Sequence, residues 1–152
     1  MYFAIIFLAV LSVVSGVLIT APAAKADNQG IFEIRTYTAH PGKLGDLNNR
    51  FKNHTNSLFV KHGIRLIGYW TPLQTCRVTP CAANAKYETP ESQNTLIYIL
   101  AYPSREAREK SFAAFQADPA WKLAYANSIK NGPLVAAIES TLLNATEYSP
   151  LQ

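Results

Sequence analysis

The sequence lacks the short motifs that mark the common nucleotide-dependent and metal-dependent enzymes. It has no G-x-G-x-x-G run, no G-x-x-x-x-G-K-[ST] loop, no G-x-S-x-G elbow and no H-E-x-x-H pair. Dinucleotide binding, phosphate binding by a P-loop, serine hydrolysis and zinc proteolysis therefore have no support in the sequence.

Charge is also sparse and scattered along the chain. The formal net charge is +4 over 152 residues, without a basic stripe or an Arg-rich arm. Because nucleic-acid-binding proteins concentrate Lys and Arg on one face or segment, nucleic acid is not expected as a partner. The length suits a single domain with its own hydrophobic core.

The longest hydrophobic run lies at the N-terminus. Residues 2–20 are almost entirely apolar, and Ala24-Lys25-Ala26 forms an A-x-A-like cleavage site. We expect residues 1–26 to be a signal peptide and residues 27–152 to be the exported domain, periplasmic or secreted and free of the membrane. The alternative is a membrane anchor retained at residues 2–20, because this run is long enough to span a bilayer.

Cysteine is limited to Cys76 and Cys81. In an exported protein such a close pair is expected to form a disulfide. A structural zinc site needs four ligands, typically with C-x-x-C spacing, and this spacing is absent. We expect no metal and no other cofactor.

Four segments have the composition of β-strands. They are residues 31–38, 64–71, 94–102 and 138–148. The first alternates cleanly, with Glu33, Arg35 and Tyr37 on the face opposite to Phe32 and Ile34. The third is a continuous apolar run, which fits a central strand.

Helical spacing fills the gaps between these strands. After the first strand, the apolar residues Leu44, Leu47, Phe51 and Leu58, together with His54, recur every three or four positions. Two more helices are predicted after the third strand, one capped by Ser104 and one by Asp118.

The resulting order is the βαββαβ plan of an α+β, ferredoxin-like unit with a four-stranded antiparallel sheet. Helices cover only one face of such a sheet, so the other face meets water, a ligand or a second subunit. We expect this second face to carry Glu33, Arg35 and Tyr37, joined by Leu96, Tyr98 and Leu100. A face of such mixed character suits a partner subunit that encloses a small polar cavity.

Four segments, in the same order, resemble the NIPSNAP family. They are F-E-I-R-T-Y followed by P-G-K, L-F-V-K-H-G-I-R-L-I-G-Y-W, A-Y-P-S-R-E-A-R and A-D-P-A-W, within a resemblance that covers residues 31–149. The resemblance implies a ferredoxin-like fold that pairs into a dimeric α/β-barrel, and it implies no established catalytic set. The longer loop that holds the cysteines departs from the family pattern.

The candidate catalytic residues are Glu33, Arg35 and His54. Glu33 and Arg35 are close enough to form a charged pair, which could bind a polar substrate or fix the register of two subunits. His54 could act as a general base or a haem ligand, or could be an ordinary packed residue. The candidate ligand-binding residues are Glu33, Arg35, Tyr37, Tyr69, Trp70 and Tyr98, although aromatic strand residues are also common core material.

Two functions remain open from the sequence. The first is a homodimer that binds a small, partly apolar molecule in the barrel cavity. The alternative is an enzyme, a cofactor-free monooxygenase or isomerase, that uses the same cavity. Haem binding through His54 is a third and weaker hypothesis.

Overall fold

A computed structural model describes residues 30–73 and 94–151 of the chain. The predicted signal peptide, the alternative anchor at residues 2–20 and the cysteine pair lie outside these residues and stay predictions. No helix within the described ranges is long and apolar enough to span a bilayer.

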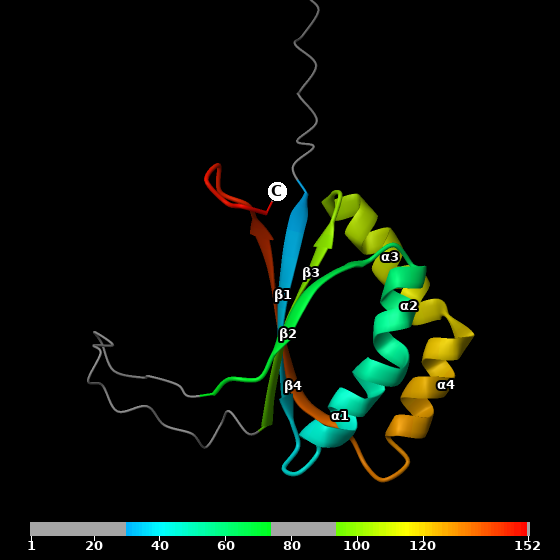
Figure 1. Ribbon diagram of the computed structural model, residues 1–152. Coiled ribbons are helices and arrows are strands. Elements are labelled where there is room, and N and C mark those ends of the chain that lie inside the picture. The colour runs from blue at the N-terminus through cyan, green and yellow to red at the C-terminus, as the bar shows by residue number, and fades with distance from the viewer. Residues whose placement is uncertain (1–29, 74–93, 152) are drawn as a thin grey trace, which may run out of the picture.

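A four-stranded antiparallel sheet in the order β2-β3-β1-β4 carries all of the helices on one face (Figure 1). The elements in chain order are β1 (Ile31–Ala39), α1 (Leu44–Arg50), a π-helical turn η1 (Phe51–Thr55), α2 (Asn56–Lys61), β2 (Arg65–Trp70), β3 (Thr95–Tyr102), α3 (Arg105–Ala117), α4 (Pro119–Ser128) and β4 (Val135–Asn144). The predicted ferredoxin-like α+β fold is confirmed. Pairing into a barrel involves a second copy and stays a prediction.

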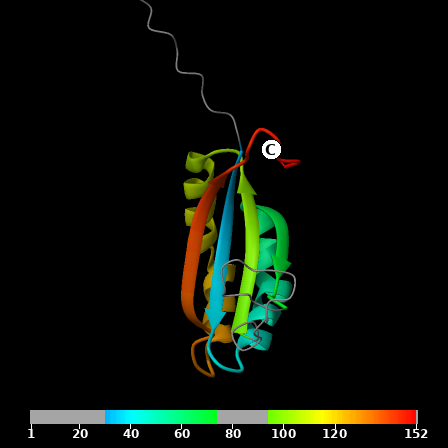
Figure 2. The same cartoon turned by 90° about the vertical axis from the view of Figure 1, so that its left-hand side faces the viewer.

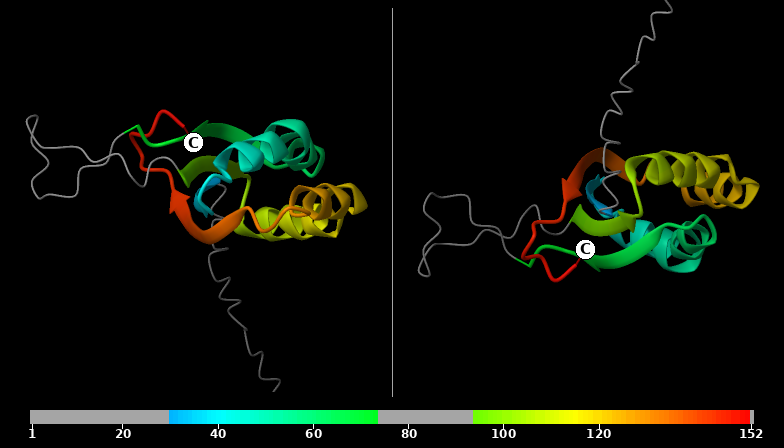
Figure 3. Two further views of the ribbon diagram at one scale, coloured as in Figure 1. Left: turned by 90° about the horizontal axis from the view of Figure 1, so that it is seen from below. Right: turned by 90° about the horizontal axis from the view of Figure 1, so that it is seen from above.

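The helices form two antiparallel arms that lie beside each other against the sheet (Figure 3). One arm is the continuous run α1-η1-α2, and the other is the pair α3 and α4. Both predicted caps of the second arm are present, because Ser104 Oγ accepts a hydrogen bond from the Ala107 N–H and Asp118 Oδ1 accepts one from the Ala120 N–H. These caps fix where α3 and α4 begin.

The last strand is displaced from its predicted position. It spans Val135–Asn144 rather than residues 138–148, because an irregularity at Thr38 and Ala39 lets Val135 pair with the end of β1. After the strand the chain turns, and the Ser149 N–H donates to the Thr146 carbonyl at 2.9 Å. The composition of residues 138–148 indicated a strand but not this register.

The π-helical turn changes which residues of the first arm are buried. The Asn56 N–H donates to the Phe51 carbonyl five residues earlier, so this turn is wider than an α-helical one. Leu47, Phe51, Thr55 and Phe59 are buried at intervals of four residues, and Arg50 is buried beside them. The predicted place of His54 on the apolar face is wrong, because this residue is exposed.

The sheet faces are the reverse of the prediction. Glu33, Arg35 and Tyr37 lie beneath the helices, and Glu33 bonds to Arg108 of α3. The side chains of Leu96, Tyr98 and Leu100 join them in the core between the sheet and the helices. Figure 2 shows the uncovered face, with the helices behind the strands. The strand register places Phe32, Ile34, Ile97, Ile99 and Leu143 on that face.

Candidate functional site

A cavity of about 560 Å³ lies between the sheet and the helices of a single chain. Its size falls within the range of small-molecule sites, about 300–1,000 Å³. The wall is built from β1, α1, η1, α2, α3, α4 and β4, and its aromatic members are Tyr37, Phe51, Phe59, Phe112, Phe115, Trp121 and Tyr125. Tyr125 and Ile138 are 45% and 49% exposed, so the mouth lies between α4 and the edge strand β4.

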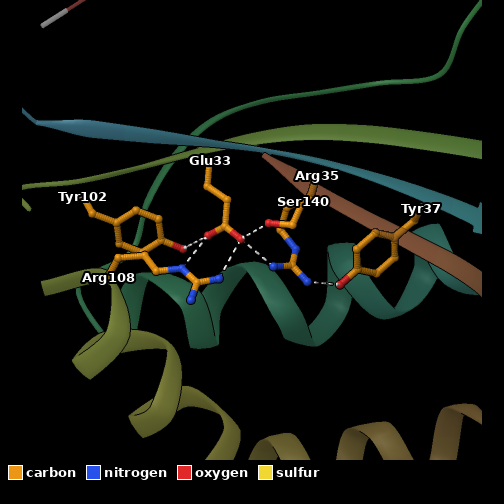
Figure 4. A network of polar contacts seen from close by, with 6 residues as sticks. All are labelled: Glu33, Arg35, Tyr37, Tyr102, Arg108 and Ser140. Atoms are coloured by element: carbon orange, nitrogen blue, oxygen red, sulfur yellow. Dashed lines mark hydrogen bonds and ion pairs between the residues drawn. The ribbon is translucent and has the colours of Figure 1, made fainter. Parts of the chain in front are cut away.

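The carboxylate of Glu33 is the centre of a buried polar network beside this cavity (Figure 4). Its side chain is fully buried and accepts five hydrogen bonds. Arg108 donates two of them in a bidentate arrangement, from Nε at 3.0 Å and from Nη2 at 2.8 Å. Arg35 Nη1 and Ser140 Oγ each donate at 2.6 Å, and Tyr102 Oη donates at 3.2 Å.

This network holds Glu33 in its ionised form. Burial alone would raise the pKa of the carboxyl group, but the hydrogen bonds from Arg108, Ser140 and Arg35 outweigh burial and lower the pKa to about 2. Both oxygens are occupied by donors. Glu33 therefore acts as the anchor that positions two arginines, and it is not available as a general base.

Arg35 extends from this anchor to the cavity wall. Its Nη2 donates to Tyr37 Oη at 3.4 Å, and its guanidinium carbon lies 4.9 Å from the centre of the Phe112 ring. Burial would lower the pKa of Arg35, but Tyr98, Tyr37 and Glu33 raise it above its ordinary value. Arg35 is therefore a fixed positive charge within the cavity wall.

Arg50, at the C-terminal end of α1, supplies a second guanidinium to the wall. It is only 6% exposed. Its Nη1 donates to Ser128 Oγ at 3.2 Å, and its guanidinium carbon lies 5.4 Å from the ring centres of both Trp121 and Tyr125. Desolvation lowers the pKa of Arg50 from its very high ordinary value.

Three tyrosines form a layer on the sheet side of the cavity. Tyr37 packs edge to face against Tyr98 with ring centres 5.3 Å apart, and Tyr98 stacks on Tyr69 at 5.4 Å. Burial raises the pKa of both Tyr69 and Tyr98, so both hydroxyls stay protonated near neutral pH. Only Tyr37 of the three lines the cavity directly.

Comparison with known proteins decides the family. The model of the NIPSNAP family matches residues 32–75 and 89–150. The chain belongs to the NIPSNAP family. No curated protein matches the chain in sequence.

Crystal structures of other NIPSNAP proteins share the fold of this one. A NIPSNAP-like domain protein of Burkholderia xenovorans is 21% identical, with 82% of this chain and 93% of that one covered and a TM-score of 0.61. A family protein of unknown function from Agrobacterium tumefaciens is also 21% identical, with 83% and 96% covered and a TM-score of 0.63. A second family protein from that organism is 22% identical, with 81% and 99% covered and a TM-score of 0.60.

The predicted site residues of this NIPSNAP domain lie in four different places. Arg35 and Tyr37 line the cavity, whereas Glu33, Tyr69 and Tyr98 pack behind them. Trp70 pairs with Ile97 in the sheet and lies on the uncovered face, 49% exposed. His54 is exposed on the outer side of the first helical arm, where it borders a second surface depression near Asn127, on the other side of Arg50 from the cavity.

Two important residues were missed from the sequence. Arg108 precedes Phe112 by four positions, and Arg50 follows Leu47 by three, so both occur at the spacing of an inward-facing helix position. A charged residue at such a position is the signal that could have identified them. No group of three or more His, Cys, Asp or Glu residues within the described ranges is placed to hold a metal ion.

Proposed function

We propose that this NIPSNAP domain binds a small, partly apolar molecule in the cavity between its sheet and its helices. The observation that carries the proposal is the lining of this cavity of about 560 Å³, in which aromatic residues are the largest group and two buried guanidinium groups lie among them. Such a combination provides apolar contact area together with a few oriented polar groups, as in most small-molecule sites.

The aromatic wall is held rigidly by ring contacts between the two helical arms. Phe115 lies 4.6 Å from Phe59 and 4.5 Å from Trp121 between ring centres. Trp121 in turn contacts Tyr125 at the mouth, at 5.7 Å. Because these rings brace one another, the cavity is available to a ligand at a small cost in conformational entropy.

The catalytic alternative, a cofactor-free monooxygenase or isomerase, is supported less well by this geometry. General acid–base chemistry needs a group whose pKa lies near the working pH. Glu33 has a pKa of about 2 and five donors around it, and His54 is outside the cavity. Such an enzyme would have to work with Arg35 and the tyrosines, so binding is the function that the site supports best.

We also propose that two copies pair through the uncovered face of the sheet. Apolar and Thr side chains dominate this face, and Glu139 is the only charged residue that the β1, β3 and β4 registers place there. Two identical faces can therefore meet without strong repulsion. We expect Ile97→Lys to give a monomer in light scattering after gel filtration and the exposed helix variant Ala113→Lys to remain a dimer; a wild-type monomer would contradict the pairing.

A neutral fluorescent probe tests the binding function. N-phenyl-1-naphthylamine brightens in apolar surroundings and carries no charge, so saturable brightening on titration is expected for the wild type. Ile138→Trp should reduce the affinity about tenfold or more, because the larger ring fills the mouth where Ile138 is half exposed. Lys122→Trp adds the same ring at an exposed position of α4 and should bind the probe as the wild type does. Equal affinity in all three proteins would contradict the cavity as the binding site.

A further inference from the structure

The cavity wall holds a buried positive charge that no carboxylate of the described residues neutralises. Arg50 is 94% buried, and the only hydrogen bond of its guanidinium group within those residues goes to the neutral hydroxyl of Ser128. Its Nε is buried without an acceptor in the described part of the chain. Because an ionised group taken out of water costs several kcal/mol, such an arginine normally has an acidic partner.

The other two arginines near the cavity show the usual arrangement. Arg35 and Arg108 both form ion pairs with Glu33, at 2.6 and 2.8 Å. One carboxylate thus serves two guanidinium groups, which leaves this cluster with a net charge of +1. No Asp or Glu is among the residues that line the cavity, so Arg50 adds a second positive charge without adding a negative one.

The groups around Arg50 offset only part of its burial cost. The electron-rich faces of the Trp121 and Tyr125 rings attract the guanidinium. Ser128 is the last residue of α4, where the helix dipole presents its negative end. The lowered pKa of Arg50 is consistent with a charge that lacks full compensation.

The lining also indicates which kind of anion fits. A guanidinium group matches a carboxylate through two parallel hydrogen bonds, whereas a phosphate dianion usually draws on several cations or backbone donors. Arg35 adds a second donor group to the same wall, and its Nε also has no acceptor in the described part of the chain. The remaining surface is mostly aromatic, which favours a flat apolar body.

We propose that the ligand of this cavity is an aromatic carboxylate, whose carboxylate group bonds to Arg50 and whose ring system packs against Phe112, Phe115 and Trp121. This inference rests on the proposed binding function and adds the charge and chemical class of the ligand. The carboxylate supplies the negative charge that the described part of the chain does not place beside Arg50.

Two isosteric probes test this inference. 2-Naphthoate and 2-naphthamide share a ring system and differ in charge, and both can be titrated by calorimetry or by quenching of tryptophan fluorescence. The wild type should bind the carboxylate about tenfold or more tightly than the amide, as expected for hydrogen bonds between charged groups. Arg50→Met should abolish this preference and leave the amide affinity within about threefold, because it removes the charge and retains most of the side-chain volume.

The matched control is Arg105→Met, which removes the same charge from an exposed position at the start of α3 and should keep the preference. Equal affinity of the wild type for the two probes would overturn the inference, and this comparison requires no variant that might fold poorly. A preference that persists in Arg50→Met would also overturn it. If the amide and the neutral naphthylamine both bind while the carboxylate has no advantage, the binding function stands and the anion inference fails; if none of the three binds, both fail.

Discussion

Replacement of Glu33 by Gln is the sharpest test of the polar network, because the change removes one charge and almost no volume. Arg35 and Arg108 would then be left without their shared carboxylate, Arg35 being 8% exposed. Removing one partner of a buried ion pair typically costs about 3–5 kcal/mol. The pKa gives a consistent figure, since a fall from 4.5 to about 2 corresponds to about 3 kcal/mol of stabilisation.

The assay is urea unfolding followed by tryptophan fluorescence and by circular dichroism. We expect Glu33→Gln to lower the free energy of unfolding by about 3 kcal/mol, with the slope against urea unchanged. Glu109→Gln removes the same charge from an exposed position on α3 and should change stability by less than about 0.5 kcal/mol.

The pH dependence supplies an independent measurement. A carboxyl group with a lowered pKa in the folded state stabilises the protein fully above its unfolded value of 4.5. That contribution is lost as the pH falls from 4.5 towards about 2. The wild type should therefore lose stability more steeply than Glu33→Gln across this window. A loss below about 1 kcal/mol for Glu33→Gln at neutral pH, or the same acid dependence in both proteins, would refute the reasoning.

Three further predictions concern stability and can be checked by the same unfolding measurements. Asp118→Ala should lower the melting temperature by several degrees, because Asp118 caps α4 and bonds to the end of the first helical arm. Hydrogen bonds from Lys61, His62 and the Ala120 N–H hold the pKa of the Asp118 carboxyl well below its ordinary value of 3.8, so the loss should become smaller as the pH falls below 3.8. Phe59→Ala should cost about 3–5 kcal/mol, whereas the adjacent and exposed Val60→Ala should cost less than about 0.5 kcal/mol. Gly68→Ala should destabilise the wild type but have little effect when it is introduced into the Trp70→Ala variant, because a Cβ at Gly68 would lie 2.6 Å from the Trp70 ring. If the stability losses of the two single variants simply add in the double variant, that contact is contradicted.

The first helical arm shows what local residue spacing can predict and what it cannot. Spacing of three and four residues correctly predicted a helix from Leu44 onwards, because apolar periodicity reports which side of a helix is buried. It could not predict the π-helical turn, which widens the helix by one residue over Phe51–Thr55. That single residue moves His54 to the surface and places Thr55 in the wall of the cavity.

The sequence by itself determined the order of strands and helices, the two helix caps and the family, since each depends on residues that are near one another in the chain. Tertiary structure alone decided which face of β1 meets the helices. The alternation of side chains along β1 places Glu33 and Arg35 on one face and Phe32 and Ile34 on the other, but it does not tell which of the two faces the helices cover. The choice depends on contacts across long stretches of chain, such as the pairing of Glu33 with Arg108, 75 residues away, and that choice places the candidate site within one subunit.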